Sequence, residues 1–360
     1  MIPVYKPYLT GHEKTYVNEC IDSTWISSKG EFIERFERDF AEFTGIDYVT
    51  SVSNGTVAIH LALEVLGIGA GDEVIVPTLT YVASVNTILQ TGACPVFVDS
   101  LEDTWQLDPE DIRRKITPRT KAVMAVHLYG LPCDMDAITA ICREHKLLLV
   151  EDAAEAFGSF YKGRHVGTFG NVGTFSFFGN KTITTGEGGM VVFRDKVVAE
   201  HARHLKNQGV SPHREYWHDV LAYNYRMTNI AAAIGLAQLE QAHEILAKKR
   251  EIAAWYHEGL TSLPVKMHKE QTDTTHSYWM CSIAVNDISQ RQALRDHLKA
   301  HGIETRPVFY PVHTLPHCAQ AGHFPIADKI SAAGINLPSW PGLGREDVNL
   351  ICRTIASFWL

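Results

Sequence analysis

Residues 147–155 read Leu-Leu-Leu-Val-Glu-Asp-Ala-Ala-Glu, and they give the clearest local sign of the fold class. Its four consecutive apolar residues predict a strand that is buried on both faces, as the strands of a parallel sheet are. The strand ends at the acidic pair Glu151 and Asp152, and small alanines leave room beside the second carboxylate. Ligands of open α/β sheets bind outside the carboxyl ends of the strands, so Asp152 is the first candidate site residue. The plain alternative is an aspartate that caps the following helix.

Similar runs continue on both sides of this stretch. Apolar or strand-like runs lie at 48–53, 73–76, 95–98, 122–126, 172–178 and 189–193. Stretches with helical spacing lie between several of them, at 55–66, 82–90, 109–116 and 135–145. This alternation predicts an α/β domain with a mostly parallel sheet that is sandwiched by helices.

The pattern changes in the last third of the chain. One long helix is predicted from Thr228 to about Tyr256, and a different pattern of strands and helices begins near residue 260. Beyond it, strands are predicted at 278–285 and 304–309, and helices at 290–300 and 345–358. We therefore expect a large domain at 1–245, which includes an N-terminal segment 1–30, and a smaller C-terminal α+β domain at 246–360.

Composition excludes several classes of protein. The 360 residues carry a formal net charge of −8, which argues against nucleic-acid or anionic-membrane partners. No apolar run approaches the roughly 20 residues of a membrane-spanning helix, and no basic stretch leads into an apolar run at the N-terminus. The seven cysteines are scattered without a Cys-x-x-Cys pair, so we expect reduced thiols, no metal and a cytoplasmic location.

A second candidate segment is the turn Ser53-Asn54-Gly55-Thr56, where a predicted strand passes into a predicted helix. Such a turn presents unpaired backbone N–H groups at the positive end of a helix dipole, and this arrangement suits a phosphate. The plain alternative is an ordinary helix cap, because Ser, Asn and Thr all favour that position.

A third candidate is Lys181, which ends the stretch 173–181, Gly-Thr-Phe-Ser-Phe-Phe-Gly-Asn-Lys. The glycine-rich stretch 184–189, Thr-Thr-Gly-Glu-Gly-Gly, follows closely, and there backbone can pass near a ligand. A loop lysine is usually a solvated charge. A desolvated lysine loses its proton more easily, and its neutral amine is the nucleophile that a Schiff base requires.

Together with Tyr223-Asn224-Tyr225-Arg226-Met227, these segments resemble the DegT-type family of nucleotide-sugar aminotransferases that depend on pyridoxal 5'-phosphate (PLP). The resemblance runs in the expected order from residues 25–30 to residues 336–340. It implies the type I fold of PLP-dependent aminotransferases, with a seven-stranded sheet in the large domain. It also implies a homodimer whose active sites lie at the interface.

The resemblance assigns cofactor roles to matching positions. Lys181 would bind PLP as a Schiff base, and Asp152 would pair with the nitrogen of the cofactor ring. The cofactor phosphate would be held by Gly55, Thr56 and Ser176, the last of which stands five residues before the lysine.

Three further cofactor contacts are implied. Tyr81 would stack on the cofactor ring, although from the residues alone it reads as a core aromatic. Asn224 would reach a cofactor phosphate across the dimer interface. Glu155 stands where many members of the family carry Gln or His, and its carboxyl group would lie near the phenolic oxygen of the cofactor.

Stretches at 27–30, 176–189, 216–220 and 304–313 are similar to one branch of the family. That branch aminates GDP-4-keto-6-deoxymannose with L-glutamate as donor, which implies a place in lipopolysaccharide O-antigen biosynthesis. Arg306, His313 and Lys29 are candidate substrate contacts, and each could instead be a surface charge.

Three alternatives remain beside this interpretation. The substrate could be a UDP- or dTDP-linked 4-keto sugar, because the sequence carries no visible mark of base recognition. Some members of the family have His in place of the lysine and remove a hydroxyl group, and Lys181 argues against that reaction. A non-catalytic regulatory homologue should have lost Lys181, Asp152 or Ser176, and all three are present.

Overall fold

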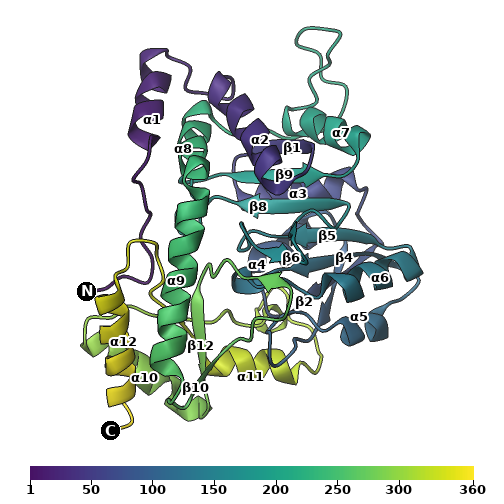
Figure 1. Cartoon of the computed structure of the whole chain (residues 1–360). Coiled ribbons are helices and arrows are strands. Elements are labelled where there is room, and N and C mark those ends of the chain that lie inside the picture. The colour runs from purple at the N-terminus through teal and green to yellow at the C-terminus, as the bar shows by residue number, and fades with distance from the viewer.

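A seven-stranded sheet lies at the centre of the computed structural model, which describes residues 1–360 (Figure 1). Its strands, in spatial order, are β1 (Tyr48–Val52), β9 (Gly189–Phe193), β8 (Val172–Ser176), β5 (Leu148–Asp152), β4 (Thr120–Val126), β2 (Glu73–Pro77) and β3 (Cys94–Val98). Only β9 runs antiparallel to its neighbours, β1 and β8. The predicted fold class, with its mostly parallel sheet, is confirmed.

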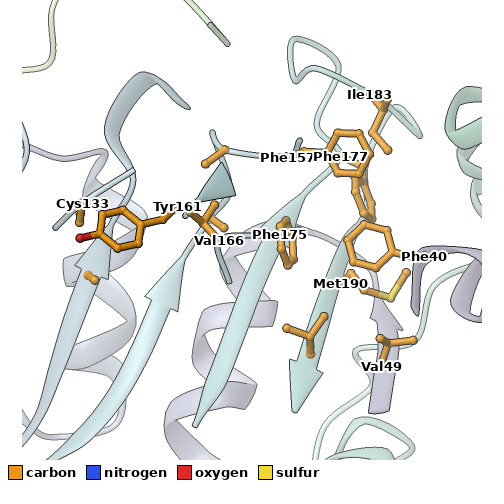
Figure 2. Close-up of a cluster of buried hydrophobic side chains, with 14 of the residues drawn as sticks. Phe40, Val49, Cys133, Phe157, Tyr161, Val166, Phe175, Phe177, Ile183 and Met190 are labelled. Atoms are coloured by element: carbon orange, nitrogen blue, oxygen red, sulfur yellow. The ribbon is translucent and has the colours of Figure 1, made fainter. Parts of the chain in front are cut away.

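Helices cover both faces of this sheet. They are α2 (Glu31–Thr44), α3 (Gly55–Val65), α4 (Val82–Gln90), α5 (Pro109–Lys115), α6 (Met135–His145), α7 (Lys196–Lys206) and α8 (Asn229–Glu240). Alternate residues of a strand point to opposite faces, so Leu149 packs into the cluster under α2 and α6, whereas Val150 packs into the cluster under α3 and α4. Figure 2 shows part of the first cluster, where Phe40 meets Phe175 and Phe177.

A second sheet follows in the last third of the chain. Its four antiparallel strands, in spatial order, are β10 (Val265–Met267), β12 (Cys281–Val285), β14 (Gly334–Leu337) and β13 (Arg306–Pro307). The helices of this region are α9 (Ala242–Leu260), α10 (Arg291–Ala300), α11 (Pro325–Ala333) and α12 (Arg345–Ser357). A separate hydrophobic cluster lies here, so this region has its own core.

The long helix expected from Thr228 is interrupted. Thr228 caps α8 through its side chain, and the helix ends at Gln241, where φ is −103° and the path turns into α9. The predicted division at 245/246 therefore falls in the first turn of α9, and the division itself stays a prediction.

The remaining elements are short. They include α1 (Glu13–Asp22) and a small three-stranded sheet of β11 (Thr274–Thr275), β6 (Phe160–Tyr161) and β7 (Arg164–His165). None of the helices combines the length and the apolar character needed to cross a membrane.

Candidate active site

A cavity of about 570 Å³ opens at the carboxyl edge of the large sheet. This is the edge where β4, β5 and β8 end and where the N-terminus of α3 begins, as expected for a ligand site of an α/β sheet. The cavity brings together eight residues singled out in the sequence: Gly55, Thr56, Tyr81, Asp152, Glu155, Ser176, Lys181 and Arg306.

Lys181 lies in the loop after β8 with its side chain largely buried. Its Nζ is 3.8 Å from Glu155 Oε1 and 3.9 Å from the centre of the Trp279 ring. The hydroxyl of Tyr5 donates a hydrogen bond to its backbone carbonyl and holds this part of the loop. Burial lowers the pKa of the Lys181 amine below its usual value, and the carboxyl groups of Glu155 and Asp152 oppose that shift. The lowered pKa increases the fraction of Lys181 that is neutral, and the neutral amine is the nucleophile.

Asp152 is the last residue of β5 and is 5% exposed. Its Oδ2 accepts a hydrogen bond from Ser84 Oγ at 2.7 Å, and its Oδ1 accepts one from the N–H of Ala154 at 3.0 Å. No Lys, Arg or His side chain forms an ion pair with it. A buried carboxylate without a cationic partner is costly, and the protonated ring nitrogen of PLP would supply that partner.

The start of α3 is both capped and open to the cavity. Asn54 Oδ1 accepts from the N–H of Val57 at 3.0 Å, which leaves the N–H groups of Gly55 and Thr56 to face an anion. A Cβ atom on Gly55 would lie 2.6 Å from the Cβ of Ser176, so only glycine allows this close approach. The cap and the phosphate site expected from the sequence are therefore compatible, and the residues present fit a phosphate.

Glu155 is buried beside Lys181, and its Oε2 accepts a hydrogen bond from the N–H of Tyr129 at 2.8 Å. Burial raises the pKa of this carboxyl to about 7, against the opposing effect of Lys181. Its protonation state therefore changes in the neutral pH range.

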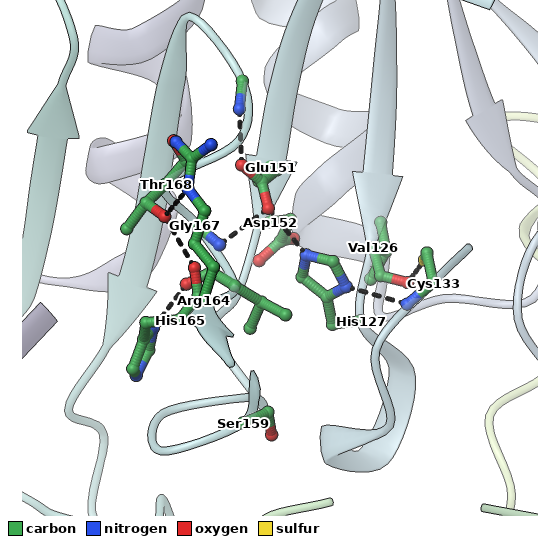
Figure 3. A network of polar contacts seen from close by, with 12 residues as sticks. Val126, His127, Cys133, Glu151, Asp152, Ser159, Arg164, His165, Gly167 and Thr168 are labelled. Atoms are coloured by element: carbon green, nitrogen blue, oxygen red, sulfur yellow. Dashed lines mark hydrogen bonds and ion pairs between the residues drawn. The ribbon is translucent and has the colours of Figure 1, made fainter. Parts of the chain in front are cut away.

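Behind the site, a buried network fixes the end of β5 (Figure 3). Glu151 accepts hydrogen bonds from the N–H groups of Gly167 and Gly170 at 2.7 and 2.6 Å, and its Oε2 is 3.1 Å from His127 Nε2. Since Cys133 N–H donates to His127 Nδ1, the proton of the neutral ring lies on Nε2 and points to Glu151. The fixed backbone in turn fixes the adjacent Asp152.

Several cavity residues were missed in the sequence. Trp279, Phe309 and Asn336 reach the cavity from the region of the second sheet. Phe309 and Asn336 lie in stretches that carry the family resemblance, but no role was predicted for them. The place of all three residues in the cavity depends on how two distant parts of the chain pack, which no local pattern shows. Ser84, which lies in α4 behind the cavity wall and donates to Asp152, was also missed.

Three predicted contacts lie elsewhere in the single chain. Asn224 is exposed and accepts a hydrogen bond from Arg226 Nε at 2.9 Å. Lys29 lines a separate hollow beside α1 and α2. His313 Nδ1 is 2.7 Å from Thr78 Oγ1, and its ring packs on Phe324.

Comparison with known proteins identifies the family to which the chain belongs. Residues 7–356 match the model of the DegT/DnrJ/EryC1/StrS aminotransferase family, and the chain belongs to this family. The predicted family, enzyme class and PLP cofactor are thereby confirmed.

Particular proteins are similar over nearly their whole length. GDP-perosamine synthase of Escherichia coli O157:H7 is 60% identical, over 99% of this chain and 98% of the relative. GDP-perosamine synthase of Vibrio cholerae is 54% identical, over 100% and 99%. Among solved structures, the aminotransferase TlmJ from Streptoalloteichus hindustanus has a TM-score of 0.95 at 34% identity, with 100% of both chains covered.

Proposed function

We propose that this cavity converts GDP-4-keto-6-deoxymannose to GDP-perosamine by transamination, with L-glutamate as amino donor. The observation that carries the proposal is the meeting of Lys181, Asp152 and Ser176 in one cavity. The sugar is supported by the similarity to GDP-perosamine synthases from two bacteria.

Bound PLP would supply an electron sink for the carbon that gains or loses a proton. Asp152 is positioned to hold the protonated ring nitrogen, and the N–H groups of Gly55 and Thr56 together with the Ser176 hydroxyl are positioned to hold the phosphate. Tyr81, which is 55% exposed at the mouth of the cavity, offers a face for the cofactor ring.

Lys181 serves as the covalent anchor and as the base that moves the proton. Its Nζ is neutral when it takes the proton from the amino donor and charged when it returns one to the sugar carbon. The neighbouring Glu155 can share that proton, because its pKa is raised to about 7 by burial.

The substrate claim is tested by a direct comparison of nucleotide sugars. We expect GDP-4-keto-6-deoxymannose to be aminated with a kcat/KM at least about tenfold above those of UDP- and dTDP-linked 4-keto sugars, a difference of about 1.4 kcal/mol in transition-state binding. Each assay uses glutamate as donor and the Lys181→Ala protein as blank. A preference for a dTDP-linked sugar would overturn the substrate claim, and normal turnover by Lys181→Ala would overturn the role of the lysine.

A homodimer with shared sites is part of the proposal. The segment between α7 and α8 projects from the molecule (Figure 1), and it carries Tyr216 at 97% and Leu221 at 92% exposed. Exposed apolar side chains on a projecting segment suit burial against a second copy of this chain. Asn224 lies three residues after Leu221, and the family resemblance implies that in the dimer it would contact the cofactor phosphate of the other subunit.

The shared site predicts complementation. Lys181→Ala and Asn224→Ala are each expected to lower activity strongly as homodimers. In a co-expressed mixture, one site of each mixed dimer would hold both native residues, so activity should rise above that of either variant. Activity in the mixture equal to the average of the two variants would contradict an Asn224 that acts across the interface.

Arg306, Lys29 and His313 all stay predicted substrate contacts, and of the three only Arg306 lines the cavity. We also place the enzyme in the cytoplasm and its product in lipopolysaccharide O-antigen. Loss of perosamine from that glycan on deletion of the gene would test this assignment.

A further inference from the structure

Trp279 lies against the reactive end of Lys181, although the two residues belong to regions with different sheets. Trp279 precedes β12 and is 4% exposed. Lys181 Nζ lies over its ring at 3.9 Å from the centroid, and Glu155 Oε1 lies 3.8 Å from the same nitrogen. The amine is therefore held between an aromatic face and a carboxyl group.

Three contacts fix the indole in this position. Its Nε1 donates a hydrogen bond of 2.7 Å to the carbonyl of Asn180, the residue just before the lysine. Its own carbonyl accepts a hydrogen bond of 2.9 Å from the buried Lys249 Nζ. Its ring stacks on Tyr129 with centroids 6.0 Å apart and an interplanar angle of 16°. The indole N–H thus connects the ring directly to the backbone of the loop that carries Lys181.

Tyr129 connects the two groups that flank the amine. The same residue that stacks on Trp279 donates its N–H to Glu155 Oε2. Tyr129 is fully buried, and its φ is +56°. A bulky residue adopts this backbone conformation only when its surroundings enforce it. The orientations of the indole and of the carboxyl group are therefore set together.

The two flanking groups act differently on the amine. Glu155 can exchange a proton with Nζ, whereas the indole cannot take one. The face of an indole attracts an ammonium through its quadrupole and contacts a neutral amine by dispersion. The ring can therefore keep Nζ in one place while the proton comes and goes, and it favours the charged form.

We propose that Trp279 is a positioning residue for Lys181. Its N–H fixes the backbone beside the lysine, and its ring face holds Nζ at the cavity wall in both protonation states. This inference rests on the proposed role of Lys181 as anchor and base.

The test measures the amine itself, on the full chain freed of PLP. Acetylation of Lys181 by trace acetic anhydride is followed by mass spectrometry from about pH 6 to about pH 11, which gives the midpoint of its titration. The variants are Trp279→Leu, which removes the aromatic face, and Trp279→Phe, which keeps a weaker face and removes the N–H. Trp340→Phe is the matched control, because Trp340 lies outside the cavity and its Nε1 has no partner.

The midpoint is expected to fall in the order Trp, Phe, Leu, by roughly 0.5 to 1 in the leucine variant, and to stay unchanged in Trp340→Phe. Glu155 and Asp152 act on Nζ, and Arg306 and Glu187 line the same cavity. All four are intact in every variant, so the shift reports on the ring. An unchanged or higher midpoint in Trp279→Leu would overturn the proposal, because a ring that only excluded water would leave or raise it.

A second measurement covers the tether. In the PLP-loaded enzyme, Trp279→Phe is expected to lower kcat about tenfold or more with little change in KM for the nucleotide sugar. A normal kcat in Trp279→Phe, whatever its KM, would overturn the role of this hydrogen bond. If Trp279→Leu does not fold, the titration midpoint of Lys181 in Trp279→Phe is the test, and it is expected to fall by a smaller amount. Normal turnover by Lys181→Ala is a separate result, and it would contradict the proposed function and not the role of Trp279.

Discussion

At the scale of single residues, the two carboxyl groups that act on Lys181 lie in different surroundings. Both oxygens of Asp152 accept hydrogen bonds, from Ser84 and Ala154, and the group lies at a strand end. Glu155 accepts one hydrogen bond from the Tyr129 backbone and otherwise faces Lys181. Two carboxyl groups in unlike environments suit unlike roles. Asp152 is suited to the role of a fixed anion, and Glu155 is suited to a role in which its charge changes.

Glu155 should make folding stability depend on pH. Its folded pKa of about 7 lies above the ordinary 4.5, so the native state binds the extra proton between these values. The unfolding free energy of the PLP-free protein should fall as the pH rises from about 4.5 to about 7, by on the order of 3 kcal/mol relative to Glu155→Gln. Urea unfolding at several pH values measures this difference. Parallel pH profiles for the two proteins would contradict it.

At the scale of elements, α3 is held against the end of β8 closely enough to exclude a methyl group. A Cβ on Gly55 would lie 2.6 Å from that of Ser176, so Gly55→Ala must push the helix start away from the Ser176 hydroxyl. We expect the Kd for PLP to rise at least about tenfold, since the phosphate would lose aligned donors. Gly69→Ala is the control, because its Cβ meets only Thr91 O, at 3.6 Å.

A dialysis or fluorescence titration with PLP checks this prediction. An unchanged Kd in Gly55→Ala would mean that the helix start does not hold the phosphate. Equal losses in the Gly55 and Gly69 variants would show a general effect of the substitution.

Elements differ in how far the sequence could predict them. The strand that ends at Asp152 was evident, because four apolar residues before an acidic pair form a local pattern. The break at Gln241 was missed, since apolar residues continue at helical spacing through it. Trp279 was missed for a different reason. Its role depends on contacts with Asn180 and Lys181, about a hundred residues earlier, and no local pattern carries such information.

At the scale of the whole molecule, Lys249 joins α9 to the segments around Trp279 and Ser339. Its Nζ donates to both carbonyls, and no carboxylate pairs with this fully buried amine. Burial lowers the pKa of Lys249 from 10.5 to about 8. The region of the second sheet therefore contains a cation that is costly to bury at neutral pH.

The lowered pKa of Lys249 makes the unfolding free energy depend on pH. The unfolded state binds more protons than the native state between pH 8 and 10.5, so the unfolding free energy contributed by Lys249 rises across that window. Relative to Lys249→Met, the protein should gain on the order of 3 kcal/mol from about pH 8 to about pH 10.5. Comparing the two proteins cancels the titration of other groups. A difference that does not vary with pH would contradict the buried charge.

The distance along the chain between Lys181 and Trp279 bears on how the enzyme is made. A ribosome adds roughly 5–20 residues each second, so the lysine is synthesised roughly 5–20 seconds before the ring that covers it. Arg306 and Asn336, which also line the cavity, are made later still. We therefore expect the Lys181 amine of the nascent chain to stay unshielded until the last third has left the ribosome and folded.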